Sequence, residues 1–192
     1  MTELDIDLVE LHRRATDAFG QRVHAVEGAD WGRPTPCPGW DVRALVQHVV
    51  GENRWTPPLL AGRTIAEVGD RFEGDLLGDV PAASWDDSAR KALEAVGRDG
   101  ALLATAHLSF GDVPGEVYVS QLFADFLVHA WDLARATGGD ERLDPELVAA
   151  CGRWFDTCED DYRAAGAVGP RVEVGADADP QTQLLARFGR QA

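Results

Sequence analysis

The sequence predicts a mostly α protein, an up-and-down bundle of four main helices with short extra helices and a small hairpin. Apolar residues recur at spacings of three and four along several long segments, as on one face of a helix. Aspartate or proline stands where these segments begin, and glycine or proline where they end. A chain of 192 residues closes one hydrophobic core, so we expect a single domain over residues 1–192.

The first part of the chain predicts two long helices that are separated by a stiff loop. Residues 5–27 carry an apolar face and predict the first helix. The following stretch, "GADWGRPTPCPGW", holds three prolines and three glycines and cannot be helical. Asp41 then stands where an N-cap belongs, and "VRALVQHVVGENRWTPPLLAG" predicts the second helix, which Pro57 and Pro58 kink or end.

The middle of the chain predicts a short helix, a long helix and a hairpin. The short helix, "IAEVGDRF", lies within a connection rich in glycine and aspartate over residues 62–84. The third long helix is expected over residues 85–106, with Asp86 or Asp87 as its cap. The segment "LSFGDVPGEVYVS" has the turn residues of a hairpin or loop around Gly111.

The last part of the chain predicts two further helices. A strongly apolar helix is expected over residues 116–137, ended by the glycine pair that starts at Gly138. Another is expected over residues 145–165, with Asp144 as its cap and proline at its first position. The tail predicts a short extended piece and a short helix.

Composition excludes some classes of function. The chain has 33 acidic and 18 basic residues and a formal net charge of −15, which disfavours nucleic acid as a partner. Such acidity is also typical of a protein that is simply soluble. No apolar run reaches the length of a membrane span, and the N-terminus lacks the pattern of a secretory signal. We therefore expect a cytoplasmic protein that acts on a small molecule, as a monomer or a homodimer, without a nucleic-acid or membrane partner.

Several cysteines and histidines are interpreted as structural. An odd number of cysteines makes a disulfide framework improbable, so the thiols are expected to be free: Cys37, Cys151 and Cys158. Cys37, in the proline-rich loop, is interpreted as a surface thiol. His12 and His24 are expected on an exposed helix face, and His107 at the end of the third long helix.

One apolar segment carries polar residues that need an explanation. In "QLFADFLVHAWDLARATGG" the polar residues Gln121, Asp125, His129 and Asp132 fall within about 80° of helix surface. A carboxylate or imidazole buried without a partner costs several kcal/mol, so these side chains must be compensated together.

The second long helix offers a partner for these four polar side chains. In "QHVVGEN", His48 and Glu52 are four residues apart and therefore share one face. Two helices that each bring an imidazole and a carboxylate can hold a divalent metal in a bundle core. Asp132 or Glu52 is expected as an additional ligand or as a base that orients a histidine, and the spacing alone does not order these roles. A purely hydrogen-bonded network is the alternative.

The same residues carry a resemblance to a known family. "TPCPGWDVRALVQHVVGENRW" followed by "DFLVHAWDLARATGG" resembles the DinB-like superfamily, in its actinobacterial metal-binding branch, which is similar to the N-terminal domain of mycothiol-dependent maleylpyruvate isomerase. The resemblance implies a four-helix bundle with zinc or nickel bound by His48, Asp125 and His129. It leaves Glu52 and Asp132 as neighbours or alternative ligands. In the isomerase the carboxylate ligand is a glutamate, so Asp125 is a departure by one methylene.

The resemblance also implies a type of chemistry. The isomerase carries a separate C-terminal domain, which we do not expect here, so maleylpyruvate isomerisation is not implied. We expect a metal-dependent thiol transferase, or an isomerase-like enzyme, with mycothiol as a cosubstrate. Arg54 or Arg135 would hold an anionic group of the substrate. The alternative is a non-catalytic bundle that binds metal or a small ligand in a structural or regulatory role.

Overall fold

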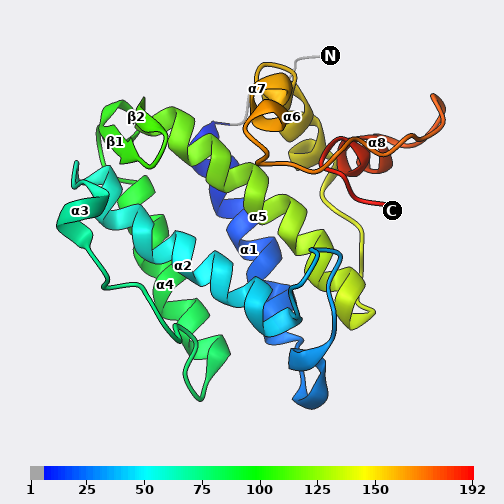
Figure 1. Ribbon diagram of the computed structural model, residues 1–192, viewed down its shortest axis with the longest axis horizontal. Helices are drawn as coiled ribbons and strands as arrows, with labels where there is room; N and C mark the ends of the chain where they lie inside the picture. Colours follow the sequence, from blue (N-terminus) through cyan, green and yellow to red (C-terminus); the bar gives the residue numbers. More distant parts are fainter. Residues whose placement is uncertain (1–6) are drawn as a thin grey trace.

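The computed structural model describes residues 7–192 and is mostly helical. Its long helices are α1 (Leu8–His24), α2 (Val42–Leu60), α4 (Pro81–Val96) and α5 (Gly115–Thr137) (Figure 1). The shorter helices are α3 (Ile65–Val68), α6 (Pro145–Phe155), α7 (Glu159–Ala164) and α8 (Pro180–Arg187), with 3-10 turns η1 (Gly28–Gly32) and η2 (Ala101–Leu103). Two strands, β1 (Thr105–Leu108) and β2 (Gly111–Pro114), complete the described part. The predicted mostly α class is confirmed.

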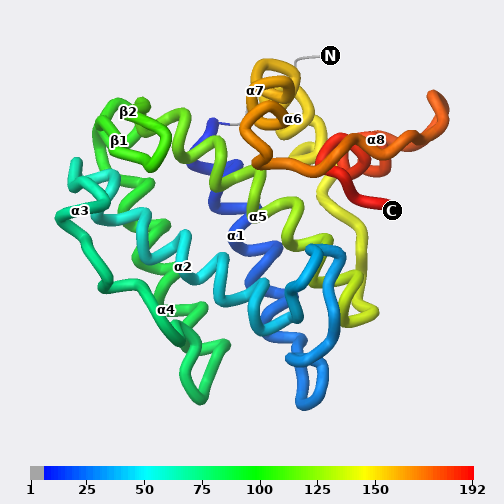
Figure 2. Tube along the Cα trace, viewed as in Figure 1, coloured from blue at the N-terminus to red at the C-terminus, as the bar shows by residue number. Residues whose placement is uncertain are grey.

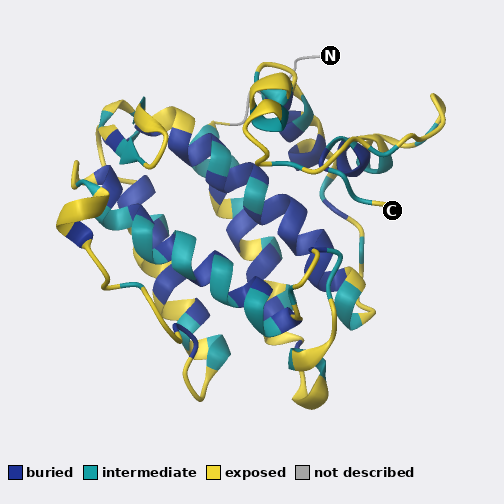
Figure 3. Ribbon diagram, in the orientation of Figure 1, coloured by how far each residue is buried: buried dark blue, intermediate teal, exposed yellow. Residues whose placement is uncertain are grey.

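The four long helices surround the main hydrophobic core. Helix α1 packs on α5 and α4, and α2 packs on α4 and α5 (Figure 2). Helices α6, α7 and α8 lie on one side of this group, next to α5, and α6 contacts both α1 and α5. Helix α5 is buried over most of its surface (Figure 3), as expected from its apolar sequence. Within residues 7–192, none of the helices combines the length and hydropathy that a membrane span needs.

Capping side chains and a glycine fix several of the predicted helix ends. Asp41 accepts a hydrogen bond from Ala44 N at the start of α2, and Asp144 accepts one from Glu146 N at the start of α6. Gly138 ends α5 in the left-handed conformation, with φ 72°. Pro57 and Pro58 lie within the last turn of α2, close to the residue at which the helix ends. The start predicted for the first helix, at residue 5, falls outside the described residues.

The third long helix differs from its prediction at both ends. It spans Pro81–Val96, so Asp86 and Asp87 lie within the helix and do not cap it. Proline is favoured in the first turn because it needs no helical N–H partner there, which explains the earlier start. The chain leaves the helix at Gly97, and the following residues form η2 and the hairpin.

The predicted hairpin is present as an antiparallel pair of strands. Thr105 pairs with Pro114 and Leu108 with Gly111. His107 therefore lies on a strand, contrary to the expectation that it ends a helix. Its Nδ1 is 2.7 Å from the Asp112 carboxylate across the hairpin.

The last predicted long helix is broken into α6 and α7. Cys158 has φ −141° and ψ 2°, which is not helical. The Thr157 hydroxyl donates a hydrogen bond of 2.6 Å to the carbonyl of Trp154. Such local side-chain bonds compete with helical backbone hydrogen bonds, which is why the helix does not continue through this point.

His12 is buried, contrary to the expectation of an exposed position. Its side chain has no solvent exposure and packs 5.5 Å from the Phe126 ring, measured between centroids. Neither ring nitrogen has a hydrogen-bond partner among residues 7–192. Burial lowers the pKa of His12 to about 4, because the protonated ring would lose its hydration. His24, by contrast, is exposed and pairs with Asp86.

This lowered pKa predicts an acid-sensitive fold. Below its ordinary pKa of 6.5, His12 takes up a proton in the unfolded chain but stays neutral in the folded chain until about pH 4. Folding stability is therefore lost as the pH falls through this window. Lowering the pH from 7 to 5.5 should reduce the free energy of unfolding of both proteins. The reduction should be about 1 kcal/mol smaller in the variant His12→Leu than in the wild type. Urea denaturation at the two pH values, in the presence of a chelator, measures the difference. Equal losses in both proteins would show that His12 titrates normally in the folded state.

Candidate metal centre

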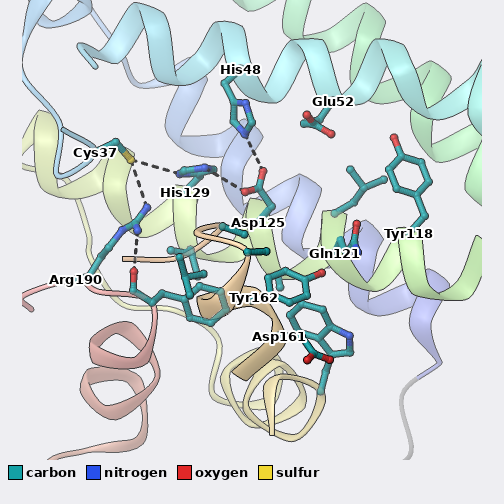
Figure 4. Close-up of a pocket in the computed structure, with 18 of the residues that line it drawn as sticks. Cys37, His48, Glu52, Tyr118, Gln121, Asp125, His129, Asp161, Tyr162 and Arg190 are labelled. Carbon is teal, nitrogen blue, oxygen red and sulfur yellow. Dashed lines mark hydrogen bonds and ion pairs between the residues drawn. The ribbon is translucent and has the colours of Figure 1, made fainter. Parts of the chain in front are cut away.

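Helices α2 and α5 bring His48, Asp125 and His129 together (Figure 4). Asp125 and His129 are one helical turn apart on α5, so their side chains share a face. His48 projects from α2 toward that face. One ligand atom from each residue lies within 4.8 Å of the other two. These are the three residues that the family resemblance implied as ligands.

The Asp125 carboxylate contacts both imidazoles. Its Oδ2 lies 3.2 Å from His48 Nε2, and its Oδ1 lies 3.2 Å from His129 Nε2. The side chain of His129 is almost fully buried, whereas those of His48 and Asp125 are about one third exposed. The shorter aspartate side chain therefore reaches both histidines, and the departure from glutamate does not separate the three groups.

The opposite charges in this cluster stabilise one another. Burial acts to raise the pKa of Asp125, but the attraction and hydrogen bond of His129 outweigh it and hold this pKa far below its ordinary value. Burial likewise lowers the pKa of each histidine, and the interaction with Asp125 reverses the shift, so that both imidazole pKa values are raised. Asp125 is therefore an ionised carboxylate, with the charge and oxygen atoms that a cation requires.

Asp132 orients His129 from the other side of its ring. His129 Nδ1 donates to Asp132 Oδ2 at 2.8 Å, which leaves Nε2 facing Asp125 and His48. Asp132 is completely buried and also accepts hydrogen bonds from Arg190, at 3.0 and 2.8 Å. A carboxylate behind a histidine in this way fixes the ring orientation and raises its basicity as a ligand. Arg190 in turn neutralises the buried carboxylate.

Cys37 lies beside His129 and Asp132 and is not a surface thiol. It is 7% exposed, and its thiol donates to Asp132 Oδ2 at 3.3 Å while Arg190 donates to its sulfur at 3.4 Å. The proline-rich loop turns this residue inward, because Thr35 holds the loop closed through hydrogen bonds to Trp40 and Cys37. Cys37, His129 and Asp132 also have donor atoms within 4.8 Å of one another, but the Arg190 guanidinium already contacts two of them. Its positive charge disfavours a cation at that point.

Glu52 lies near the three candidate ligands but outside their group of donor atoms. Burial foremost, and then the negative charge of Asp125, raise the pKa of Glu52. Its carboxylate accepts no hydrogen bond from the residues that the structure describes. Glu52 was expected as an additional ligand or as a base that orients a histidine. The structure does not place its carboxylate with the three candidate ligand atoms.

The candidate ligands open onto a cavity of about 860 Å³. One wall comes from α2, α5 and the loop that carries Cys37 and Trp40. The opposite wall comes from the last part of the chain, through Trp154, Tyr162 and Arg190. A cavity of this size suits a small organic molecule.

Two arginines predicted as substrate contacts lie away from this cavity. Arg54 donates to the carbonyl of Leu76 at 2.8 Å. Arg135 pairs with Glu141 at 2.8 Å and stacks over the Trp131 ring. Neither lines the cavity. Sequence reasoning instead missed Arg190 and the inward position of Cys37, since both depend on contacts between distant parts of the chain.

The fold and this cluster define a class of protein: a helical protein in which two helices present two histidines and a carboxylate to a cavity. Residues 12–134 match the family model described as the mycothiol maleylpyruvate isomerase N-terminal domain. The chain belongs to this family. The matched segment contains the three candidate ligands together with Cys37 and Asp132, whereas Arg190 lies beyond it.

Similar proteins are found in Mycobacterium tuberculosis. Two proteins from different strains, each named as an uncharacterized protein, are 38% identical to this chain over 143 residues. The alignment covers 74% of this chain and 74% of each relative. No solved structure gives a significant match.

The pairing of Arg190 with buried Asp132 predicts a measurable contribution to stability. The variant Arg190→Met should lower the free energy of unfolding by about 2 to 4 kcal/mol, because it leaves a buried carboxylate with one charged partner fewer. The matched control is Arg142→Met, which breaks an exposed pair with Asp140 and should leave the free energy of unfolding almost unchanged. Urea denaturation measures both. Equal, small changes in the two variants would contradict this role for Arg190.

Proposed function

We propose that this protein binds one divalent metal through His48, Asp125 and His129 and uses it to act on a small molecule. The observation that carries the proposal is the meeting of two imidazoles and one carboxylate at 3.2 Å, from two helices, on the wall of a cavity. The interpretation of the four long helices as an up-and-down DinB-like bundle, in a single domain, is part of the same proposal.

The donor atoms suit a divalent transition metal. Tetrahedral zinc binds imidazole nitrogen at about 2.0–2.1 Å, so two of its ligand atoms lie about 3.3 Å apart. The two histidine–aspartate separations of 3.2 Å are close to this value. Imidazole nitrogen is a good ligand for zinc and nickel, which are the metals we propose.

The residues around the candidate ligands support catalysis more than a purely structural role. Structural zinc sites are closed by four protein ligands, whereas catalytic sites have three and an open position. Here three donors converge, Glu52 lies outside the group, and the cavity is adjacent. A non-catalytic metal-binding or regulatory module is the alternative, and it would require a fourth protein ligand.

We propose a thiol as the cosubstrate, with mycothiol as the candidate that the family description names. A divalent metal, when bound, would lower the pKa of a thiol or water at its open position, which favours the nucleophilic form near neutral pH. The chain's own side chains would orient the ligands and hold the proton. Asp132 orients His129, and Arg190 balances the charge of Asp132. Glu52, with its raised pKa, is placed to hold or release a proton at the cavity wall. Thiol transfer and an isomerase-like reaction both fit this arrangement.

Metal analysis tests the first step. Protein purified without an affinity tag should contain about one divalent ion per chain, and His48→Ala and His129→Ala should each reduce this content at least about tenfold, because each removes one of three ligands. The control His24→Ala changes an exposed histidine that is remote from the cavity and should leave the metal content unchanged. Elemental analysis by mass spectrometry measures the content. Metal-free wild-type protein that also takes up no added zinc or nickel would refute the proposal.

A conjugation assay tests the second step. The metal-loaded protein should accelerate the reaction of mycothiol with small electrophiles, and chelation or His48→Ala should reduce the rate at least about a hundredfold, toward the uncatalysed rate. Loss of thiol, followed with a chromogenic reagent, measures the rate. Stoichiometric metal without activity across a broad electrophile panel would favour the non-catalytic alternative.

A further inference from the structure

Apart from the two histidines of the candidate metal centre, the cavity is lined by more carboxylates than guanidinium groups. Three carboxylates line it, from Glu52, Asp125 and Asp161, against a single arginine, Arg190. Asp125 is paired with the two histidines and belongs to the candidate metal centre. Glu52 and Asp161 are thus the two lining acids outside that centre.

The one lining arginine is already paired. Arg190 donates two hydrogen bonds to Asp132, and its side chain is 17% exposed. Releasing it to bind a substrate anion would leave Asp132 buried with only His129 and the Cys37 thiol beside it. The cavity therefore offers no unpaired lysine or arginine from the described residues to a carboxylate, phosphate or sulfonate group.

Glu52 is a carboxylate that lacks a protein partner. It lies on α2 four residues after His48, and Figure 4 shows it on the cavity side of the helix, beside Tyr118. No described residue donates a hydrogen bond to it. Glu52 is only partly exposed, and a carboxylate at a cavity wall without a protein partner is suited to a hydrogen-bond donor or a cation that the ligand itself brings.

The remaining wall is largely aromatic and apolar. The aromatic lining residues are Trp40, Phe110, Tyr118, Trp154, Tyr162 and Phe188. Such rings accept a flat apolar body, and their faces attract a cation. The net charge of −15 on the whole chain adds a long-range preference for cations over anions.

We infer that the cavity binds a small molecule with an apolar, ring-sized body and a basic nitrogen, and that the protonated nitrogen pairs with Glu52. This inference names the substrate class of the proposed metal-dependent function and in that sense rests on it. The substrate anion that Arg54 or Arg135 was expected to bind is not part of this assignment. Binding of the amine is a property of the cavity wall, so it is measurable with and without metal.

A matched set of three ligands tests the inference. Naphthylmethylamine, naphthylmethanol and naphthoate share one aromatic body and differ in the charge of the head group. Isothermal titration calorimetry at pH 7 would be done with chelator-treated protein and with zinc-loaded protein. The amine should bind at least about tenfold more tightly than the alcohol in both forms, and in the chelator-treated form the carboxylate should bind no more tightly than the alcohol.

Variants of Glu52 identify the group responsible. Glu52→Gln should lower the affinity for the amine to about that for the alcohol and leave binding of the alcohol unchanged, which also shows that the cavity is intact. The control Glu94→Gln removes an exposed carboxylate of α4 and should change neither affinity. Equal affinities for amine and alcohol, no binding of the amine, or an unchanged amine affinity in Glu52→Gln would overturn the inference. Metal-free protein that binds the amine as expected would leave the inference standing while the proposed metal function failed.

Discussion

The contact of the Asp125 carboxylate with His48 and His129 is the interaction on which the site depends. Helix α5 is buried over most of its surface, and an ionised side chain in such a helix requires a partner of opposite charge. Asp125 obtains two, one from its own helix and one from α2. Asp132, two turns along, obtains His129 and Arg190. The charged side chains of α5 are thus compensated by neighbouring elements, and the same contacts hold three candidate metal-ligand atoms at a cavity.

The cavity depends on the last part of the chain as well as on the segment that matches the family model. The match ends at residue 134, and Trp154, Tyr162 and Arg190, which form the opposite wall, come later. Arg190 ties this wall to the site through Asp132. A family member that shares these candidate ligands but differs in the later segment would have a similar cluster beside a different wall. The composition of that wall is therefore where ligand preference is expected to differ.

Sequence periodicity predicted the long helices and the two faces that carry His48 with Glu52 and Asp125 with His129, because each depends on spacing within one helix. The choice of His48, Asp125 and His129 as the ligand set followed from the family resemblance, since spacing alone left the roles of Glu52 and Asp132 open. The end of α4 was predicted too late. The prediction extended to residue 106, but the helix ends at its C-cap, Gly97, and Leu103 beyond it is 86% exposed. Cys37 and Arg190 could not be placed in advance, since their positions follow from how a loop and the chain's last residues fold onto α5. His12 was misjudged because its neighbour Phe126 belongs to another helix.

We propose that the metal ligands are two imidazoles and a carboxylate, and that Cys37 is not among them. X-ray absorption spectroscopy of the zinc-loaded protein tests it most directly, because it measures the ligand shell itself. We expect only nitrogen and oxygen neighbours, at about 2.0–2.1 Å, with the signature of two imidazole rings. A sulfur neighbour at about 2.3 Å would contradict it, since that distance would place the metal in the cluster of Cys37, His129 and Asp132.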